Sequence, residues 1–259
     1  MRDASAALAE TLDSLRAAAS FLTRLPLSPE LRPARDFLAR ASVAFPIVGA
    51  AIGAAGGVIY ALFAAFALPP LVCAFAALAF GAALTGALHE DGLADFCDGI
   101  GGGRDRHDRL RIMRDSHNGS YGTLALVMSV GIRAALLAGI AAAGPVTAAL
   151  VAAGAVSRGL LPAIMGLMAP ARADGLGATA GQPSRPRFVA ALGLAFVLAW
   201  GAMGFAAALA SALFATAGAA AVALVARRLL GGHTGDVLGA CQQAAEIAVL
   251  TVAAVMAVP

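Results

Sequence analysis

Acidic side chains gather between two apolar segments, from Leu88 to Gly122, where nearly half of the chain's 15 carboxylates lie. If the helix that arrives from Leu78 continues through Asp98, the side chains of Asp91, Asp95 and Asp98 fall within roughly 60° of one another around its axis. Three like charges on one stripe repel, and a divalent cation is the simplest agent that makes the arrangement favourable. The stripe predicts a metal site whose chemistry acts on phosphates.

Glycine and arginine follow the carboxylates. The stretch Gly101-Gly102-Gly103-Arg104 is expected to break the helix and to provide backbone N–H groups and a guanidinium, the components of a phosphate cradle. Phosphoryl transfer needs both a bound metal ion and positively charged groups beside the non-bridging oxygens. The position of these residues next to the three aspartates therefore favours a metal site that acts on phosphates. The charged stretch that follows has an equally good explanation as the solvated face of an amphipathic helix, which would account for Arg106, Asp108 and Arg109.

Two further polar stretches precede apolar segments. The first, Asp115 to Gly122, has small and hydrogen-bonding residues that would let an anion approach a helix N-terminus, although capping by Ser116 or Asn118 explains part of it. The second ends in Thr234, Gly235 and Asp236. Asp236 either caps the following helix or joins the aspartate site, since it returns to the same membrane face.

His89 lies on the opposite side of an ideal helix from the three aspartates. It either supports the metal ligands without touching the ion, or indicates that the helix unwinds there. A histidine can act as a general base, and a hydrogen-bonding residue at a helix end is nearly as good an explanation.

The setting of these residues is a membrane. Hydrophobic residues make up 60% of the 259-residue chain and charged residues 13%, with a mean hydropathy of +0.84, whereas soluble domains average about 25% charged. Apolar runs close to the roughly 20 residues that cross a bilayer predict one all-α, polytopic membrane domain over residues 1–259, with about seven transmembrane helices. The runs are Phe45 to Leu68, Leu71 to Leu88, Tyr121 to Ala143, Val146 to Ala169, Phe188 to Ala206, Ala208 to Ala226 and Val237 to Val258.

The orientation follows from the basic residues. The chain has no lysine, and all of its 18 arginines except Arg133 and Arg158 lie in alternate connections on one side. The positive-inside rule places that side in the cytoplasm, together with the N-terminus and the aspartates of the predicted active site. An odd number of helices then leaves the C-terminus outside. This topological bias also explains the net charge of +3 without nucleic-acid binding.

The first forty residues lack a continuous apolar run and do not resemble a cleavable signal peptide. Apolar residues recur there at helical spacing, at Leu8, Leu12, Leu15, Ala19 and Leu22. The pattern predicts an amphipathic helix that lies at the membrane interface and ends at Leu25-Pro26, with a plain surface helix as the alternative. The three scattered cysteines are expected to be free thiols.

Three charges fall inside the apolar runs: Arg133, Arg158 and Glu246. A charge within the bilayer costs about 3 kcal/mol or more, so each needs a partner or a polar cavity. Arg158 and Glu246 come at nearly equal depth when counted from the outer ends of their helices. We expect these two to form a structural ion pair.

The motifs closely resemble, in order and nearly end to end, those of the adenosylcobinamide-GDP ribazoletransferase (cobalamin synthase) family. They are Phe21-Leu22-Thr23-Arg24-Leu25-Pro26, Phe45-Pro46-x-x-Gly49, His89-x-Asp91-Gly92-Leu93-Ala94-Asp95-x-x-Asp98-Gly99, Gly103-Arg104, Ile112-Met113-Arg114-Asp115-Ser116, Ser157-Arg158, Asp174-Gly175-Leu176-Gly177 and Thr234-Gly235-Asp236-Val237-Leu238-Gly239-Ala240.

The resemblance implies an integral enzyme of the bacterial inner membrane that acts late in cobalamin biosynthesis. Its nucleophile would be α-ribazole or α-ribazole 5′-phosphate, which would attack adenosylcobinamide-GDP, release GMP and give adenosylcobalamin or its 5′-phosphate. Mg²⁺ would hold the diphosphate against Asp91, Asp95 and Asp98. The remaining catalytic candidates are His89, Arg104 and Asp236, and the substrate-binding candidates are Arg24, Gly102, Gly103, Arg104, Arg114, Asp115, Asn118 and Thr234. Arg104 is favoured for the diphosphate contact.

Two positions depart from the family pattern. Glu90 occupies a place that is usually apolar in relatives, so it is expected to be a peripheral extra charge rather than a metal ligand. Gln243 stands where relatives generally have a glutamate, which argues against an essential ionised group at that position.

Two other functions compete with this interpretation. A CDP-alcohol phosphotransferase also places aspartates at the ends of membrane helices, but its Ala-Arg after Asp98-Gly99 is replaced here by Gly102-Gly103. A small-solute transporter would explain the intramembrane charges, but transporters place their polar site near the midplane, and here the acidic residues gather at one surface. A homo-oligomer, or a complex with the enzymes that make the two substrates, is compatible with the sequence, although no residue argues for it.

Overall fold

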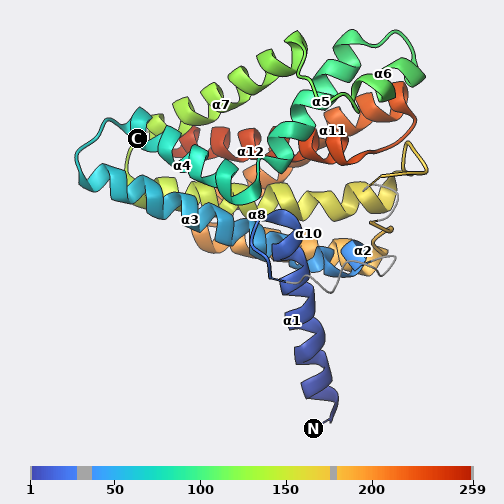
Figure 1. Ribbon diagram of the computed structural model, residues 1–259. Helices are drawn as coiled ribbons and strands as arrows, with labels where there is room; N and C mark the ends of the chain where they lie inside the picture. The colour runs from blue at the N-terminus through green and yellow to red at the C-terminus, as the bar shows by residue number, and fades with distance from the viewer. Residues whose placement is uncertain (1, 28–36, 176–179, 258–259) are drawn as a thin grey trace.

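The computed structural model describes residues 2–27, 37–175 and 180–257, and the elements found there are helical (Figure 1). In chain order they are α1 (Arg2–Leu22), α2 (Phe37–Ala41), the 3-10 turn η1 (Ser42–Ala44), α3 (Phe45–Ala65), α4 (Pro70–Thr85), α5 (Leu88–Gly102), α6 (Arg106–Ile112), α7 (Ser120–Ile140), α8 (Ala143–Leu167), α10 (Arg185–Met203), α11 (Phe205–Leu230) and α12 (Gly235–Ala257).

The apolar runs of the sequence correspond to long helices. Six stretches of described residues are long and apolar enough to cross a membrane, and α4 with α5 forms a seventh candidate that is bent by 90°. The expected all-α, multi-pass architecture is therefore confirmed. The end of the bundle that carries α5, α6 and the connections 113–119, 168–175 and 231–234 is called the charged face below.

The bend corrects one expectation. The helix that passes Leu78 does not continue through Asp98, because α4 ends at Thr85 and a new helix begins at Leu88. Gly86 ends α4 in a left-handed conformation with φ of +68°, and Ala87 follows with φ of +56°. Glycine adopts this conformation readily, and the Ala87 N–H satisfies the end of α4 by donating to the Ala82 carbonyl at 2.8 Å. The three aspartates still share one helix, α5, in its new direction.

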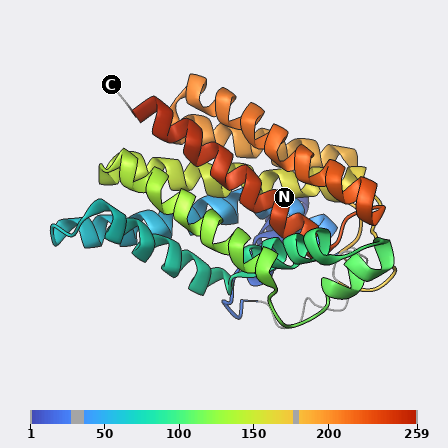
Figure 2. The same ribbon diagram turned by 90° about the horizontal axis from the view of Figure 1, so that it is seen from above.

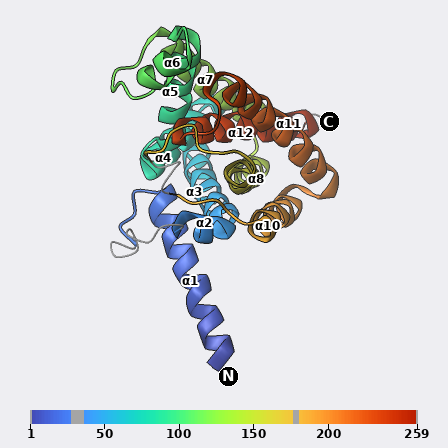
Figure 3. The same cartoon turned by 90° about the vertical axis from the view of Figure 1, so that its right-hand side faces the viewer.

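Helix α8 lies at the centre of the bundle. Figure 3 shows it end-on, with α3, α10 and α12 around it. In the 18-residue stretch of α8 that best fits a membrane span, 78% is buried inside the protein, whereas the corresponding value for α10 is 17%. Backbone contact with α3 is close because Gly49 faces Gly154, and a Cβ atom on either glycine would collide with the carbonyl of the other.

A second glycine contact fixes α5 against α12. A Cβ atom on Gly92 would lie 3.0 Å from Asp236 Cα, and one on Gly239 would lie 3.0 Å from the His89 carbonyl oxygen. Seen from above, α12 lies beside α11 on one side and α7 on the other, and α4 follows α7 (Figure 2). The aspartates of α5 therefore stand beside the N-terminus of α12.

Helix α1 leaves the bundle crosswise to α3 and α8 (Figures 1 and 3). Its last turns bury Ala17, Ala18 and Leu22 against Phe45 of α3, while Leu12 is exposed. If α3 and α8 cross a bilayer, a helix in this direction runs parallel to the bilayer plane. That α1 lies at the membrane interface, rather than being a plain surface helix, stays a prediction of its amphipathic pattern. Helix α1 ends at Leu22, three residues before the expected end.

Candidate active site at the charged face

The three aspartates of α5 differ in their surroundings. Asp91 is exposed, Asp95 is half-buried and Asp98 is buried. Asp95 lies within electrostatic reach of Asp91, Asp98 and Asp236. Among the described residues neither Asp91 nor Asp95 has a hydrogen-bond partner for its carboxylate, so both remain able to bind a ligand.

Asp98 is occupied by the chain itself. Its Oδ2 accepts the Gly119 N–H at 2.7 Å, and its Oδ1 accepts the Gly122 N–H at 2.9 Å. These donors belong to the first turn of α7, whose free N–H groups need acceptors. A Cβ atom on either glycine would collide with the Asp98 carboxylate. Asp98 therefore caps α7 across the fold.

Asp236 joins the aspartates of α5 from the start of α12. Its Oδ2 accepts the Thr234 hydroxyl at 3.1 Å and Arg172 Nη2 at 3.1 Å. The capping role belongs to Thr234, whose Oγ1 accepts the Val237 N–H at 3.2 Å. Asp236 is thus held near Asp91 and Asp95 by a hydroxyl and a guanidinium, rather than being only a helix cap.

The part of the chain that the structure describes contains no group of three or more histidine, cysteine or acidic side chains arranged to hold a metal ion. The expected set of three α5 aspartates is not preformed, because Asp98 turns towards α7. Mg²⁺ does not require such a cage, since it usually keeps several waters and binds one or two carboxylates together with substrate phosphates. Asp91 and Asp95, whose oxygens are free, fit that demand.

The three arginines expected at the site differ in their partners and in how near they lie to the aspartates in the chain. Arg104 is exposed just past the end of α5, and its N–H donates to Asp108 at 3.2 Å. Arg114 donates through Nη2 to both carboxylate oxygens of Asp174 at 2.7 Å, and both side chains are largely exposed. Arg24 is exposed beside Gly86 at the bend between α4 and α5. Arg104 is the one that follows directly on the aspartate helix.

The charged stretch after Arg104 is mainly structural. Arg106 donates through Nε to the Leu230 carbonyl at 2.7 Å and also bonds the Ala171 carbonyl, which ties α6 to the end of α11. Asp108 pairs with Arg111 at 2.6 Å, and this contact lowers the pKa of the carboxyl. Asp108 belongs to the solvated face of an amphipathic helix, as the alternative interpretation expected. Arg106 instead connects α6 to the end of α11 and to residue 171.

The glycines and the connection before α7 line the same face. Helix α5 ends at Gly102, and Gly103 follows in an extended conformation. Asp115 accepts the ring and backbone N–H groups of His117, which lowers the pKa of its carboxyl, and Asn118 is exposed.

Arg172 was missed by the sequence analysis. It is half-buried and is the cation nearest the aspartate cluster by contact, since it pairs with Asp236. The sequence offered one indication of this role, because Arg172 stands two residues before the Asp174-Gly175 motif. The spacing of residues does not distinguish Arg172 from the other arginines on the arginine-rich side.

His89 and two of the aspartates share a cavity. The imidazole is 3% exposed, and its Nδ1 has no hydrogen-bond partner among the described residues. The cavity has a volume of ≈ 160 Å³ and is lined by His89, Asp91 and Asp236 at one edge and by apolar side chains elsewhere. His89 is therefore buried beside Asp91 and Asp236 rather than exposed with Asp91.

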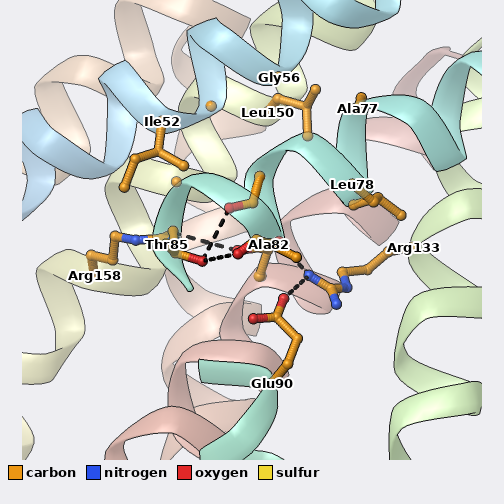
Figure 4. A pocket seen from close by; sticks show the side chains of 14 residues that line it. Ile52, Gly56, Ala77, Leu78, Ala82, Thr85, Glu90, Arg133, Leu150 and Arg158 are labelled. Atoms are coloured by element: carbon orange, nitrogen blue, oxygen red, sulfur yellow. Dashed lines mark hydrogen bonds and ion pairs between the residues drawn. The ribbon is translucent and has the colours of Figure 1, made fainter. Parts of the chain in front are cut away.

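A buried ion network lies deeper in the bundle. Arg133 on α7 pairs with Glu246 at 3.0 Å and with Glu90 at 3.1 Å, and Arg158 pairs with Glu246 at 3.5 Å. The structure thus brings together the expected Arg158 and Glu246, with Arg133 as the closer partner. Figure 4 shows Arg133, Arg158 and Glu90 around a small cavity of ≈ 40 Å³.

Glu90 corrects another expectation. It is not peripheral, because its side chain is only 16% exposed and Arg133 and Gln243 both donate to its Oε1. Gln242 adds a donor to Glu246 at 2.5 Å, so two carboxylates, two guanidiniums and two amides form one network, in which Arg158 Nε has no partner among the described residues. Buried charges are stable only when they are paired and hydrogen-bonded in this way.

Comparison with known proteins places the chain among cobalamin enzymes. A family model described as cobalamin-5-phosphate synthase matches residues 14–254. Proteins named adenosylcobinamide-GDP ribazoletransferase are similar nearly end to end. That of Bradyrhizobium diazoefficiens is 45% identical over 240 residues, covering 93% of this chain and 92% of the relative. That of Rhizobium etli strain CIAT 652 is 46% identical over 247 residues, covering 92% and 95%. No solved structure matches the chain.

Proposed function

The chain belongs to the cobalamin-5-phosphate synthase family, and we propose that it joins ribazole to adenosylcobinamide-GDP at the charged face, with Asp91, Asp95 and Asp236 at the reacting phosphates. The nucleophile is a hydroxyl of α-ribazole or of α-ribazole 5′-phosphate. The enzyme is a transferase of cobalamin biosynthesis. This assignment replaces the CDP-alcohol phosphotransferase and transporter alternatives.

The observation that carries the site is the meeting of two helices. The glycine contact between Gly92 and Gly239 lets α5 and α12 approach closely enough for Asp91 and Asp95 to face Asp236. Carboxylates without a protein partner at a membrane surface attract a cation and, through it, an anionic substrate. The diphosphate of adenosylcobinamide-GDP is such a substrate.

Mg²⁺ is the cation that this donor set suits, and Asp91 and Asp95 would hold it. When bound, it would neutralise the diphosphate oxygens and stabilise the leaving GMP. Asp98 supports this arrangement by fixing α7 to α5 through the Gly119 and Gly122 N–H groups.

The other roles in the transfer step fall to side chains of the charged face. The attacking hydroxyl forms a bond to the phosphorus that bears the cobinamide, the bond from that phosphorus to the oxygen of GMP breaks, and the hydroxyl proton is transferred to a base. Asp236, which Thr234 and Arg172 hold in place, is the carboxylate best fixed to accept the proton. Arg104, exposed after the glycines, contacts the non-bridging oxygens, with Arg114 and Arg24 further out.

The protein is a multi-pass membrane protein, and its orientation follows the arginines. We place the charged face and the N-terminus in the cytoplasm, because all arginines except Arg133 and Arg158 fall in the connections that the sequence assigns to one side. The family resemblance suggests that the membrane is the bacterial inner membrane. Reporter fusions at the C-terminus that are active only in the periplasm would support this orientation, and activity only in the cytoplasm would contradict it.

The test is the reaction itself. We would measure GMP release and corrinoid product by purified protein in lipid, with adenosylcobinamide-GDP and α-ribazole, over a range of magnesium concentrations. We expect product to require magnesium and to fall at least a hundredfold in Asp91→Asn, about the effect of losing one electrostatic contact to a transition state. Asp13→Asn, the same chemical change at an exposed position of α1, is the matched control. Full activity of Asp91→Asn would exclude this site.

A further inference from the structure

The ≈ 160 Å³ cavity beside Asp91 and Asp236 is unexplained by phosphate chemistry. Its other walls are apolar: Leu161 and Met165 on α8 are buried, and Leu238 comes from α12. Water is a poor occupant for such walls, since a water molecule needs two to four polar partners. The cavity has the character of a site for an apolar group.

Aromatic rings form one wall. Phe21 of α1 and Phe45 of α3 both line the cavity, and their rings stack with centroids 5.9 Å apart and an interplanar angle of 19°. Parallel rings present flat surfaces against which another flat ring packs favourably.

The polar edge carries an unmet donor or acceptor. His89 lines the cavity, is 3% exposed, and its Nδ1 has no partner among the described residues. A buried polar atom without a partner is costly, and a native structure that keeps one commonly supplies the partner as a ligand or a water. A ligand that fits must be a flat apolar ring with one nitrogen or oxygen at its edge.

We propose that this cavity binds the base of ribazole, with His89 Nδ1–H donating to the ring nitrogen that does not carry the ribose. The proposal rests on the proposed function, because it names the subsite of the second substrate. A benzimidazole is flat, bicyclic and apolar, with one free ring nitrogen as its acceptor. Its attached ribose then reaches the edge formed by Asp91 and Asp236, where the phosphates react.

Size decides between the two substrates. An apolar cavity of about 150 Å³ in another protein holds a benzene ring, so the present cavity is of ring size and excludes a corrin macrocycle. A lipid chain is the remaining apolar candidate, but it would leave His89 unpaired. The corrin part of adenosylcobinamide-GDP must therefore lie outside, over the exposed part of the charged face.

The first experiment fills the cavity. Leu238→Phe should raise the KM for α-ribazole at least tenfold and leave the KM for adenosylcobinamide-GDP unchanged. Leu62→Phe, the same change at an exposed position of α3, is the control that should alter neither value. Unchanged KM for α-ribazole in an active Leu238→Phe enzyme would overturn the proposal, as would an equal rise for both substrates. If the unaltered protein releases no GMP at all, the proposed function fails instead.

The second experiment tests the hydrogen bond by binding alone. Equilibrium dialysis would compare α-ribazole with the corresponding indole riboside, which has a C–H in place of the free nitrogen. The unaltered protein should prefer α-ribazole roughly tenfold, as the loss of one buried hydrogen bond implies. His89→Leu should bind both alike, and His89→Asn, which keeps an N–H near the Nδ1 position, should recover part of the preference. Equal binding of both ribosides by the unaltered protein would overturn the role of His89.

Discussion

Gln243 on α12 donates through Nε2 to Glu90 Oε1 on α5 at 3.2 Å, and the same carboxylate oxygen accepts from Arg133 at 3.1 Å. The family resemblance predicts an apolar residue at position 90 and a glutamate at position 243, so both are positions where this sequence is expected to differ from relatives. In the structure the carboxylate of Glu90 on α5 reaches the cluster that Gln243 joins from α12. We therefore expect Glu90 to supply the charge that Gln243 lacks.

A pair of variants can test whether a carboxylate at position 243 replaces the one at position 90. Glu90→Leu removes one partner of a buried arginine and should destabilise the protein by about 3–5 kcal/mol. Gln243→Glu alone adds a carboxylate beside Glu90 and should also destabilise it. The double variant Glu90→Leu with Gln243→Glu should recover most of the loss, which thermal unfolding in detergent would measure. Additive losses would mean that the two side chains do not share a role.

Asp98 and Asp91 should fail in different ways. Asp98→Ala removes the acceptor for the first turn of α7 and should cost about 1–2 kcal/mol of stability. Hydrogen exchange should rise in residues 113–123, while the magnesium concentration for half-maximal activity should stay nearly unchanged. Asp91→Asn should shift that magnesium concentration upward with normal exchange. A large magnesium shift in Asp98→Ala would make Asp98 a ligand rather than a cap.

The exposed Arg114–Asp174 ion pair should matter to substrate more than to folding. An exposed pair contributes about 0–1 kcal/mol, so Arg114→Gln should barely change the unfolding temperature. If Arg114 contacts the diphosphate, its loss should raise the KM for adenosylcobinamide-GDP, and Asp174→Asn, which frees the guanidinium, should lower it. Arg16→Gln, in the exposed Arg16–Asp13 pair of α1, is the control. Equal kinetics for Arg114→Gln and Arg16→Gln would remove Arg114 from the site.

His233 should make stability depend on pH. It precedes α12, is 1% exposed, and neither ring nitrogen has a partner among the described residues. Burial lowers its pKa below the usual 6.5, so the unfolded chain binds a proton more readily than the folded one. Stability should therefore fall as the pH drops below about 6.5. His233→Phe should show a smaller fall in unfolding temperature between pH 7 and pH 5, and an unchanged fall would contradict this assignment.

The spans were predictable because hydrophobic length is a local property. The break at Gly86 and Ala87 was not, since an apolar run continues across it and only the packing of Arg24 and the α4 carbonyls defines the turn. The aspartates were predictable as a group, because they lie on one helix. The partners of Asp98 and Glu90 were not, because they come from α7 and α12, and no spacing along α5 reveals what packs against it.

The break between α4 and α5 also shapes the membrane around the enzyme. Helix α4 has 16 residues, which extend about 24 Å and fall short of the roughly 30 Å of hydrocarbon that a span must cross. Where α4 stops, the chain turns by 90° into a helix bearing carboxylates that lipid tails cannot solvate. A span this short is accommodated by local thinning of the bilayer, so we expect water to reach deeper beside α5 than at the surrounding headgroups. A bulky corrinoid substrate could then reach the carboxylates of α5 without leaving water.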